Sequence, residues 1–368
     1  MIRKIDSPME HYEVHLRATA EWLLASIEHG NGGSAAHYAP ILGWSKPYPE
    51  TTGYIIPTLL KLSEYLCRDD FEKVALRLGE WLLEIQRRDG AWNGGLHSGQ
   101  DKDVGSVFNT GQILKGLCAL YRLTADEKFL EAGAKGANWL AAGVSEDGLW
   151  PSGDYQSNLT PSYYTHVCWP MLETWSETGD NNVRDSAVRF LDTVVSRRLK
   201  NGVISGWGFK EGSPAFTHTI AYTIRGLQES ARLLDDYSRY GEPIELALEV
   251  LVKKSELRGG RLPGRFDESW VPAGGYQCLT GNVQLAFCFL LLEERVPDLR
   301  LVSAAARLID AVCDAQNLSS SRTGIKGGVA GSSPLWGRYM TMRYPNWAAK
   351  YHCDALIKIM ARLEGVKP

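Results

Sequence analysis

The feature of the sequence that most limits its fold is an internal repeat of six apolar segments. Each segment begins around a threonine or asparagine, usually followed by a small residue or histidine, and continues as an apolar run. Thr and Asn are common N-caps, so we expect this anchor residue to mark the start of a helix. Successive anchors are between 52 and 66 positions apart, at Thr52, Thr110, Thr165, Thr217, Thr280 and Asn346.

A second, amphipathic segment precedes each apolar one, and most of these segments end in a glycine-containing turn. "GEWLLEIQRRDGAW" from Gly79 and "ANWLAAGVSEDGLW" from Ala137 are visibly related. Glycine adopts the left-handed conformation that commonly ends a helix. Nothing in the sequence predicts alternating strands. Six apolar inner helices that alternate with six amphipathic outer helices predict an all-α, single-domain (α/α)6 barrel over residues 1–368.

The repeat resembles the α/α toroids, which include six-hairpin glycosidases, polysaccharide lyases, epimerases and terpenoid cyclases. "QRRDGAW" from Gln86 resembles a structural turn of squalene-type cyclases. Segments such as "YPETTGY", "FNTGQIL" and "YPNWAAK" are similar to proteins encoded in bacterial exopolysaccharide gene clusters, over most of the chain. The resemblance implies a toroid with a role in polysaccharide metabolism.

Composition and missing motifs exclude several classes of function. A formal net charge of −3 leaves no basic surface for nucleic acid. There is no apolar run long enough to span a membrane and no signal peptide, and the seven cysteines lack CxxC spacing, so we expect a cytoplasmic protein. The absence of HExxH, Walker, GxGxxG and DDxxD motifs predicts no metal and no cofactor.

The predicted barrel has two unlike ends. Connections from inner to outer helices are short, whereas those from outer to inner helices are long, for example residues 31–50, 89–109 and 319–346. Long ordered loops usually carry function. They meet the six N-termini of the inner helices, whose partial positive charge favours an anionic ligand. We expect the site at this end, which we call the mouth.

Acidic residues at the mouth suggest glycoside hydrolysis, which generally needs two carboxyl groups across the bond. Glu50 lies two residues before the first anchor, and Asp154 and Glu268 lie in later long connections. The sequence does not decide which of these acids face each other. Alternatively, Glu50 only stabilises the N-terminus of its own helix, by about 0.5 kcal/mol.

Histidines and tyrosines at the mouth suggest a different reaction. His166 and His218 follow their anchors at the position where other repeats have glycine, and Tyr164 lies just before His166. Such a set can abstract the C5 proton of a uronic acid, with Arg265, Arg338 or Arg343 holding the carboxylate. The alternative is that each histidine is buried and bonded to a neighbouring carbonyl.

Aromatic and amide side chains near the mouth are candidate contacts to sugar. The predicted substrate-binding residues are Tyr48, Tyr54, Trp92, Asn109, Gln112, Trp207, Asn282, Trp336, Arg343 and Trp347. For Trp92 and Trp207 the alternative is that the indole only plugs a glycine turn.

The sequence therefore favours a glycoside hydrolase that acts on an acidic poly- or oligosaccharide in bacterial polysaccharide metabolism. A uronate lyase or C5-epimerase that uses the Tyr/His set is the first alternative. A non-catalytic, glycan-binding scaffold of a polysaccharide assembly system is the second. All three share the fold, and toroids host unrelated functions.

Overall fold

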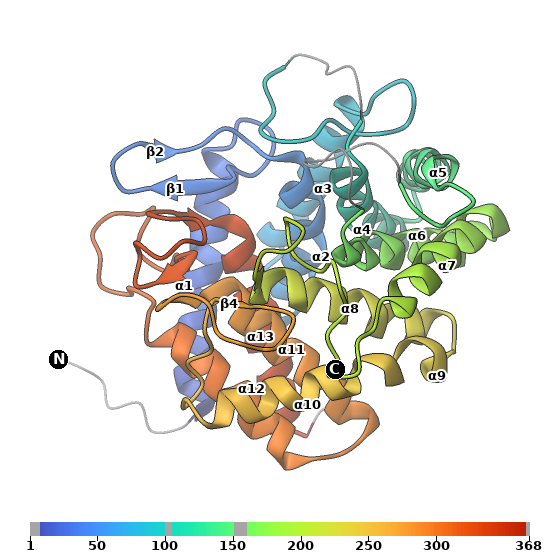
Figure 1. The fold of residues 1–368 in the computed structure, drawn as a ribbon. Coiled ribbons are helices and arrows are strands. Elements are labelled where there is room, and N and C mark those ends of the chain that lie inside the picture. Colours follow the sequence, from blue (N-terminus) through green and yellow to red (C-terminus); the bar gives the residue numbers. More distant parts are fainter. Residues whose placement is uncertain (1–7, 100–104, 151–159, 366–368) are drawn as a thin grey trace.

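The computed structural model describes residues 8–99, 105–150 and 160–365. Six inner helices pack against one another in chain order, and the last returns to the first, so that the ring is closed. This arrangement confirms the predicted (α/α)6 barrel (Figure 1). The inner helices are α2 (Pro49–Leu66), α4 (Val107–Thr124), α6 (Thr165–Thr178), α8 (Thr217–Leu233), α11 (Leu279–Arg295) and α13 (Asn346–Leu363).

Six outer helices surround this ring, and burial distinguishes the two sets. In an inner helix such as α11, every residue from Leu279 to Leu290 is buried. Outer helices bury one stripe at helical spacing, as expected where one face meets solvent. They are α1 (Pro8–Glu28), α3 (Asp70–Glu84), α5 (Glu127–Gly143), α7 (Asn181–Ser196), α10 (Glu242–Glu256) and α12 (Leu299–Cys313), with the short helices η1 (Ser162–Tyr164) and α9 (Tyr237–Tyr240) between them.

The small residue after three of the anchors is explained by close contact between inner helices. A Cβ atom added to Gly53 would lie 2.5 Å from the Cα of Ile113 on α4, and one added to Gly111 would lie 2.6 Å from Cγ1 of Val167 on α6. Such distances are well inside van der Waals contact. Glycine at these positions therefore lets neighbouring inner helices approach closely.

The prediction that the anchors mark helix starts is confirmed for Thr165, Thr217 and Asn346, which are the first residues of α6, α8 and α13. None of the six anchors is the N-cap itself, and for Thr52 and Thr110 the predicted start is wrong. Helices α2 and α4 have already begun three residues before Thr52 and Thr110. The two hydroxyl oxygens instead accept hydrogen bonds from the backbone N–H groups of Ser34 (2.9 Å) and Trp92 (3.0 Å). The anchor thus ties the preceding long connection to the first turn of the inner helix.

The long connections contain short antiparallel strands that the sequence did not predict, because runs of two or three residues leave no alternating pattern. In one sheet, β1 (His37–Ala39) lies between β2 (Gly43–Trp44) and β7 (Tyr344–Pro345). This pairing joins the first long connection to the last. The inner helices that follow these two connections, α2 and α13, are also in contact. The other pairs are β3 (Ala215–Phe216) with β4 (Arg265–Phe266), and β5 (Gln277–Cys278) with β6 (Ser332–Ser333).

Two further properties of the structure concern its cysteines and the length and polarity of its helices. All seven cysteines are free. Among the helices that the structure describes, none combines the length and the apolar character needed to cross a membrane.

Candidate active site

Polar side chains from the inner helices converge on the axis of the barrel, which we call the lumen. A cavity of about 30 Å³ remains among them, enough for water but not for a sugar ring. A saccharide would therefore have to bind above this cavity, toward the mouth. The cavity is lined by His166, Trp169, Arg225, Gln284, Phe287, Lys350, Tyr351 and Asp354, from four of the six inner helices.

His166 is the most connected group of the lumen. Its Nε2 lies 3.2 Å from the Tyr351 hydroxyl, and its ring nitrogens lie 3.3 and 3.2 Å from Nζ of Lys115. Burial, and then the charge of Lys115, hold the pKa of His166 well below its usual range. The imidazole is therefore neutral near neutral pH, with a lone pair on one of its ring nitrogens.

Lys115 shares this environment and is held in place by Gln112. The ammonium nitrogen donates to Oε1 of Gln112 (2.8 Å) and lies 4.0 Å above the ring of Trp169. The amide nitrogen of Gln112 in turn donates to the backbone carbonyl of His166 (3.0 Å), which fixes the orientation of the amide. Burial, and then the charge of Lys350, lower the pKa of Lys115 well below its usual value.

His218 reaches the lumen from the next inner helix. Its Nδ1 lies 2.8 Å from Oε1 of Gln284, and burial lowers its pKa to about 4. The ring of Tyr222 lies between the two histidines, with centroids 4.2 Å from His218 and 4.3 Å from His166. Two neutral imidazoles therefore flank one tyrosine.

Glu50 belongs to the same cluster. It lies in the first turn of α2 with only 7% of its surface exposed. Burial, and then the negative charge of Glu50, raise the pKa of Tyr54, and the same charge contributes to the raised pKa of Tyr222 and of Tyr351. The Tyr54 hydroxyl makes no hydrogen bond within the described part of the chain. One carboxylate thus lies among the phenol groups of the lumen.

Cations and ion pairs complete the lumen. Lys350 forms a 2.5 Å ion pair with Asp354, which also accepts a hydrogen bond from Thr58 (2.9 Å). Arg225 pairs with Glu229 at 2.6 Å. Each of these two cations is therefore balanced by a carboxylate, and Lys115 lies close enough to Lys350 for the charge of Lys350 to contribute to the lowered pKa of Lys115.

Tyr164 is not part of this cluster, although it lies two residues before His166. It is buried in η1, with its ring 5.9 Å from Trp150 and 6.5 Å from Phe190 of the outer helix α7. Tyr222 and Tyr351 are the tyrosines that contact His166. A sequence signal for Tyr222 was present, because it follows His218 by four residues and so shares its helix face.

Glu268, another of the predicted acids, does not lie in the lumen. It is exposed and accepts a 2.6 Å hydrogen bond from the hydroxyl of Ser205. Together with Trp207 it lines a separate cleft of about 550 Å³ between two long connections. Asp154 lies outside the described residues.

The predicted tryptophans occupy three different environments. Trp92 is fully buried and donates to the Leu82 carbonyl (2.8 Å), and Trp207 is 2% exposed, so the geometry favours packing for both. Trp347 is half-buried, donates to the Tyr339 hydroxyl (2.9 Å) and faces Tyr48 at 6.5 Å between centroids. Trp336 is 72% exposed.

The remaining predicted contacts lie in the first turns of inner helices or near the rim. The Asn109 amide donates to the Asn93 carbonyl (3.0 Å), and the Asn282 amide donates to Gln277 (3.2 Å); both asparagines are fully buried. Arg343 is half-buried beside His37, where burial and then the arginine charge lower the pKa of that histidine to about 4.

In chemical terms, the lumen combines neutral imidazoles, phenols, carboxylates and cations from the first turns and middle turns of the inner helices. Neutral imidazoles and a carboxylate can transfer protons. Ammonium and guanidinium groups favour a ligand that carries a carboxylate. Lys115, Tyr222 and Tyr351 were not predicted, because only the packing of different inner helices brings them to His166.

Several solved structures share this architecture. An unsaturated glucuronyl hydrolase specific for heparin superposes with a TM-score of 0.75 at 15% identity, covering 97% of this chain and 98% of that one. The unsaturated glucuronyl hydrolase of Bacillus sp. GL1 gives 0.73 at 15% identity, covering 96% and 97%. The cellobiose 2-epimerase of Bacillus thermoamylovorans gives 0.76 at 14% identity, covering 96% and 99%. No family model matches the chain, and no sequence among the curated proteins does. At these identities the similarity establishes the (α/α)6 fold.

Proposed function

We propose that this chain is a carbohydrate-active enzyme that hydrolyses an acidic oligosaccharide at the mouth side of the lumen. The observation that carries the proposal is the convergence of Glu50, His166 and His218 on one buried, cation-rich cluster. The shared fold supports it, because one structural neighbour is described as responsible for the degradation of glycosaminoglycan. The role in bacterial polysaccharide metabolism rests on the resemblance in sequence.

In this proposal the Glu50 carboxyl group, in its protonated form, donates its proton to the leaving oxygen of the glycosidic bond and becomes a carboxylate. Hydrolysis also needs a group that activates water. Asp154 is the partner that the sequence predicts for that role. Lys115 and Arg343 attract the carboxylate of a uronic acid, and Tyr48 and Trp347 offer aromatic faces to the sugar ring.

A second candidate reaction is epimerisation or elimination at the carbon next to the uronate carboxylate. It is favoured by the placement of Tyr222 between the neutral imidazoles of His166 and His218. One imidazole would remove the carbon-bound proton, and Tyr222 or the other imidazole would return a proton to carbon or protonate the leaving oxygen. The cellobiose 2-epimerase shows that this fold also hosts an epimerase.

The test is product analysis by mass spectrometry after incubation with uronate-containing oligosaccharides in deuterium oxide. Hydrolysis gives fragments that gain one water after back-exchange. Elimination gives fragments without that water and with a new ultraviolet absorbance, and epimerisation leaves deuterium on carbon without cleavage. A glycan-binding scaffold would bind a member of the panel without changing it.

Matched variants assign the roles. Glu50→Gln should reduce hydrolysis by roughly 10²–10⁴-fold, the usual contribution of a general acid. Glu268→Gln, in the separate cleft, is the control and should retain activity. If Glu50→Gln keeps full hydrolytic activity, Glu50 is not the acid. Activity that depends on His166 and His218 instead would support the second candidate.

A further inference from the structure

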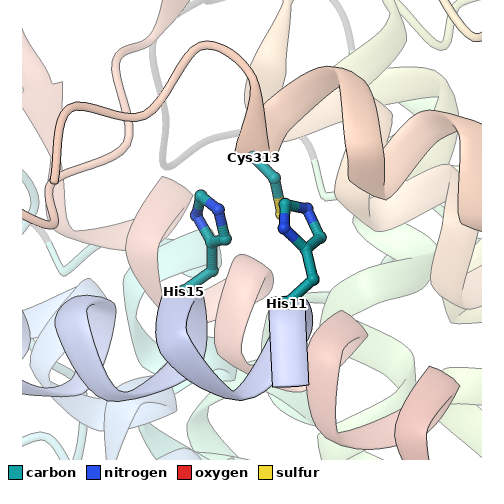
Figure 2. Close-up of side chains that lie close together, drawn as sticks. All are labelled: His11, His15 and Cys313. Carbon is teal, nitrogen blue, oxygen red and sulfur yellow. The ribbon is translucent and has the colours of Figure 1, made fainter. Parts of the chain in front are cut away.

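Three side chains with metal-ligating atoms meet away from the lumen, where the two ends of the chain come together. They are His11 and His15 on α1 and Cys313 at the end of α12. Their candidate ligand atoms all lie within 4.8 Å of one another. Figure 2 shows both imidazoles projecting from the same side of α1 toward the Cys313 side chain. The spacing i, i+4 places the two rings on one helix face, with centroids 4.7 Å apart.

The hydrogen bonds of Gln316 determine which nitrogen of His15 is available. The amide nitrogen of Gln316 donates to the Gly327 carbonyl and to the Thr19 hydroxyl (2.5 and 2.8 Å), so its oxygen must face His15. That oxygen lies 2.5 Å from Nδ1 of His15, and since it can only accept, Nδ1 carries the proton. Nε2 of a neutral His15 therefore keeps its lone pair. In metal sites, the ring N–H of a ligating histidine is typically donated to such an acceptor, which orients the imidazole.

A fourth group lies against the cluster from the inner ring. His352 on α13 is fully buried, and its Nε2 lies 3.9 Å from Sγ of Cys313. Its Nδ1 has no hydrogen-bond partner within the described residues. A buried imidazole that is held this weakly is costly, and a cation beside its Nε2 would supply a strong partner.

The surroundings favour a cation over an anion. Two acidic residues lie next to Cys313, Asp310 three positions before it on α12 and Asp314 directly after it. The Tyr12 hydroxyl donates to Asp310 at 2.9 Å and holds that carboxylate in place. On binding a divalent cation, Cys313 loses its thiol proton to solvent as the metal–sulfur bond forms.

We infer that His11, His15, Cys313 and His352 form a zinc site that fastens the first helix of the chain to its last hairpin. Three imidazoles and one thiolate form a ligand set that suits tetrahedral Zn²⁺. Zinc bonds of about 2.0–2.3 Å require the ligand atoms of His11, His15 and Cys313 to approach one another by roughly 1 Å, and the His352 ring to move in beside them. Helix α1 packs against α13 from outside the inner ring, as Figure 1 shows for the blue and red ends of the chain. The metal would therefore fasten the outer helix α1 to the last hairpin, a role separate from the lumen.

Cobalt titration of the chelator-treated full chain tests this inference, because Co²⁺ reports a thiolate ligand by its charge-transfer absorption. We expect one equivalent to bind with that absorption and with the intense visible bands of a tetrahedral site, and zinc to displace it and raise the Tm. Cys313→Ser should abolish the charge-transfer band. Gln316→Ala should weaken zinc binding by on the order of 10–100-fold, as for loss of an outer partner.

Two further variants keep the test decisive. His11→Ala changes a partly exposed residue, so it should fold normally by circular dichroism and still lose tight binding. Cys67→Ser, at an exposed cysteine outside the cluster, should leave the titration unchanged. The inference is overturned if the wild-type chain shows no thiolate band, or if the band survives Cys313→Ser and His11→Ala.

Discussion

Lys115 and His166, 51 residues apart in the sequence, are in direct contact: Nζ of the lysine lies 3.2 Å from Nε2 and 3.3 Å from Nδ1 of the histidine. Two basic groups at this distance disfavour each other's charged forms. The contact therefore favours the neutral form of the imidazole and places the lysine nitrogen, the candidate group for binding an anion, directly beside it. It joins the two functions that the proposed reaction needs, proton transfer and recognition of a carboxylate.

Lys115→Met should change both the pKa of His166 and the affinity for an anionic oligosaccharide, and each effect can be measured by itself. Removing the ammonium charge should raise the pKa of His166, because that charge is the second cause of its lowering after burial. It should also weaken binding of an anionic oligosaccharide by roughly 10-fold or more, since a charged hydrogen bond contributes about 1.5–3 kcal/mol. NMR titration of His166 and a measured Kd test the two effects. Lys73→Met, which removes an exposed lysine paired with Asp69, is the control and should change neither.

The stability of the protein should decrease as the pH falls below the ordinary pKa of histidine. Burial lowers the pKa of His218 from 6.5 to about 4, so between these values the unfolded chain binds a proton that the folded chain does not. The contribution of His218 is complete above about pH 6.5 and is lost toward pH 4, by roughly 3 kcal/mol. His352, whose pKa burial lowers to about 3, acts in the same direction.

Urea unfolding at pH 4.5 and pH 7 measures this dependence. His218→Gln should make the free energy of unfolding less dependent on pH over this range, while His29→Gln, at an exposed histidine, should leave the slope unchanged. An unchanged slope in His218→Gln would show that His218 is not held neutral in the folded protein.

Glycine at the contact between inner helices should be essential for packing. Gly111→Ala places a methyl group 2.6 Å from Val167 and should lower the free energy of unfolding by about 1–3 kcal/mol, the usual cost of overpacking. Gly133→Ala in the outer helix α5 meets only Leu117, at 3.9 Å, and should stabilise the protein by up to about 1 kcal/mol through helix propensity. Chemical denaturation of the pair tests the closeness of the inner ring, and equal effects would contradict it.

Trp92 and Trp347 should differ in what their loss affects. Trp92→Ala removes a fully buried indole and should cost about 3–5 kcal/mol of stability without changing the kcat of the folded fraction. Trp347→Ala, at the half-buried rim beside Tyr48, should cost less stability and raise the KM for an oligosaccharide. A raised KM in Trp92→Ala and not in Trp347→Ala would place the sugar contact at the buried indole.

The repeat of anchors and turns was sufficient to predict the barrel and the end that carries the long connections. The grouping of Glu50 with the histidines required the structure. Tyr164 shows why, because it lies in the short helix η1 that precedes α6, where its ring packs against Trp150 and Phe190. Tyr222 follows His218 by four positions and shares its face, so that pairing was accessible to sequence analysis.

The sequence alone determined the order and polarity of the helices, because helical periodicity and turn residues act over a few neighbouring positions. Tertiary structure alone decided which side chains meet across the lumen and between α1 and the last hairpin. Lys115 meets His166 from another helix, and His11 meets Cys313 from the opposite end of the chain. These contacts depend on the rotation of each helix about its own axis, which is set by close packing at positions such as Gly53 and Gly111.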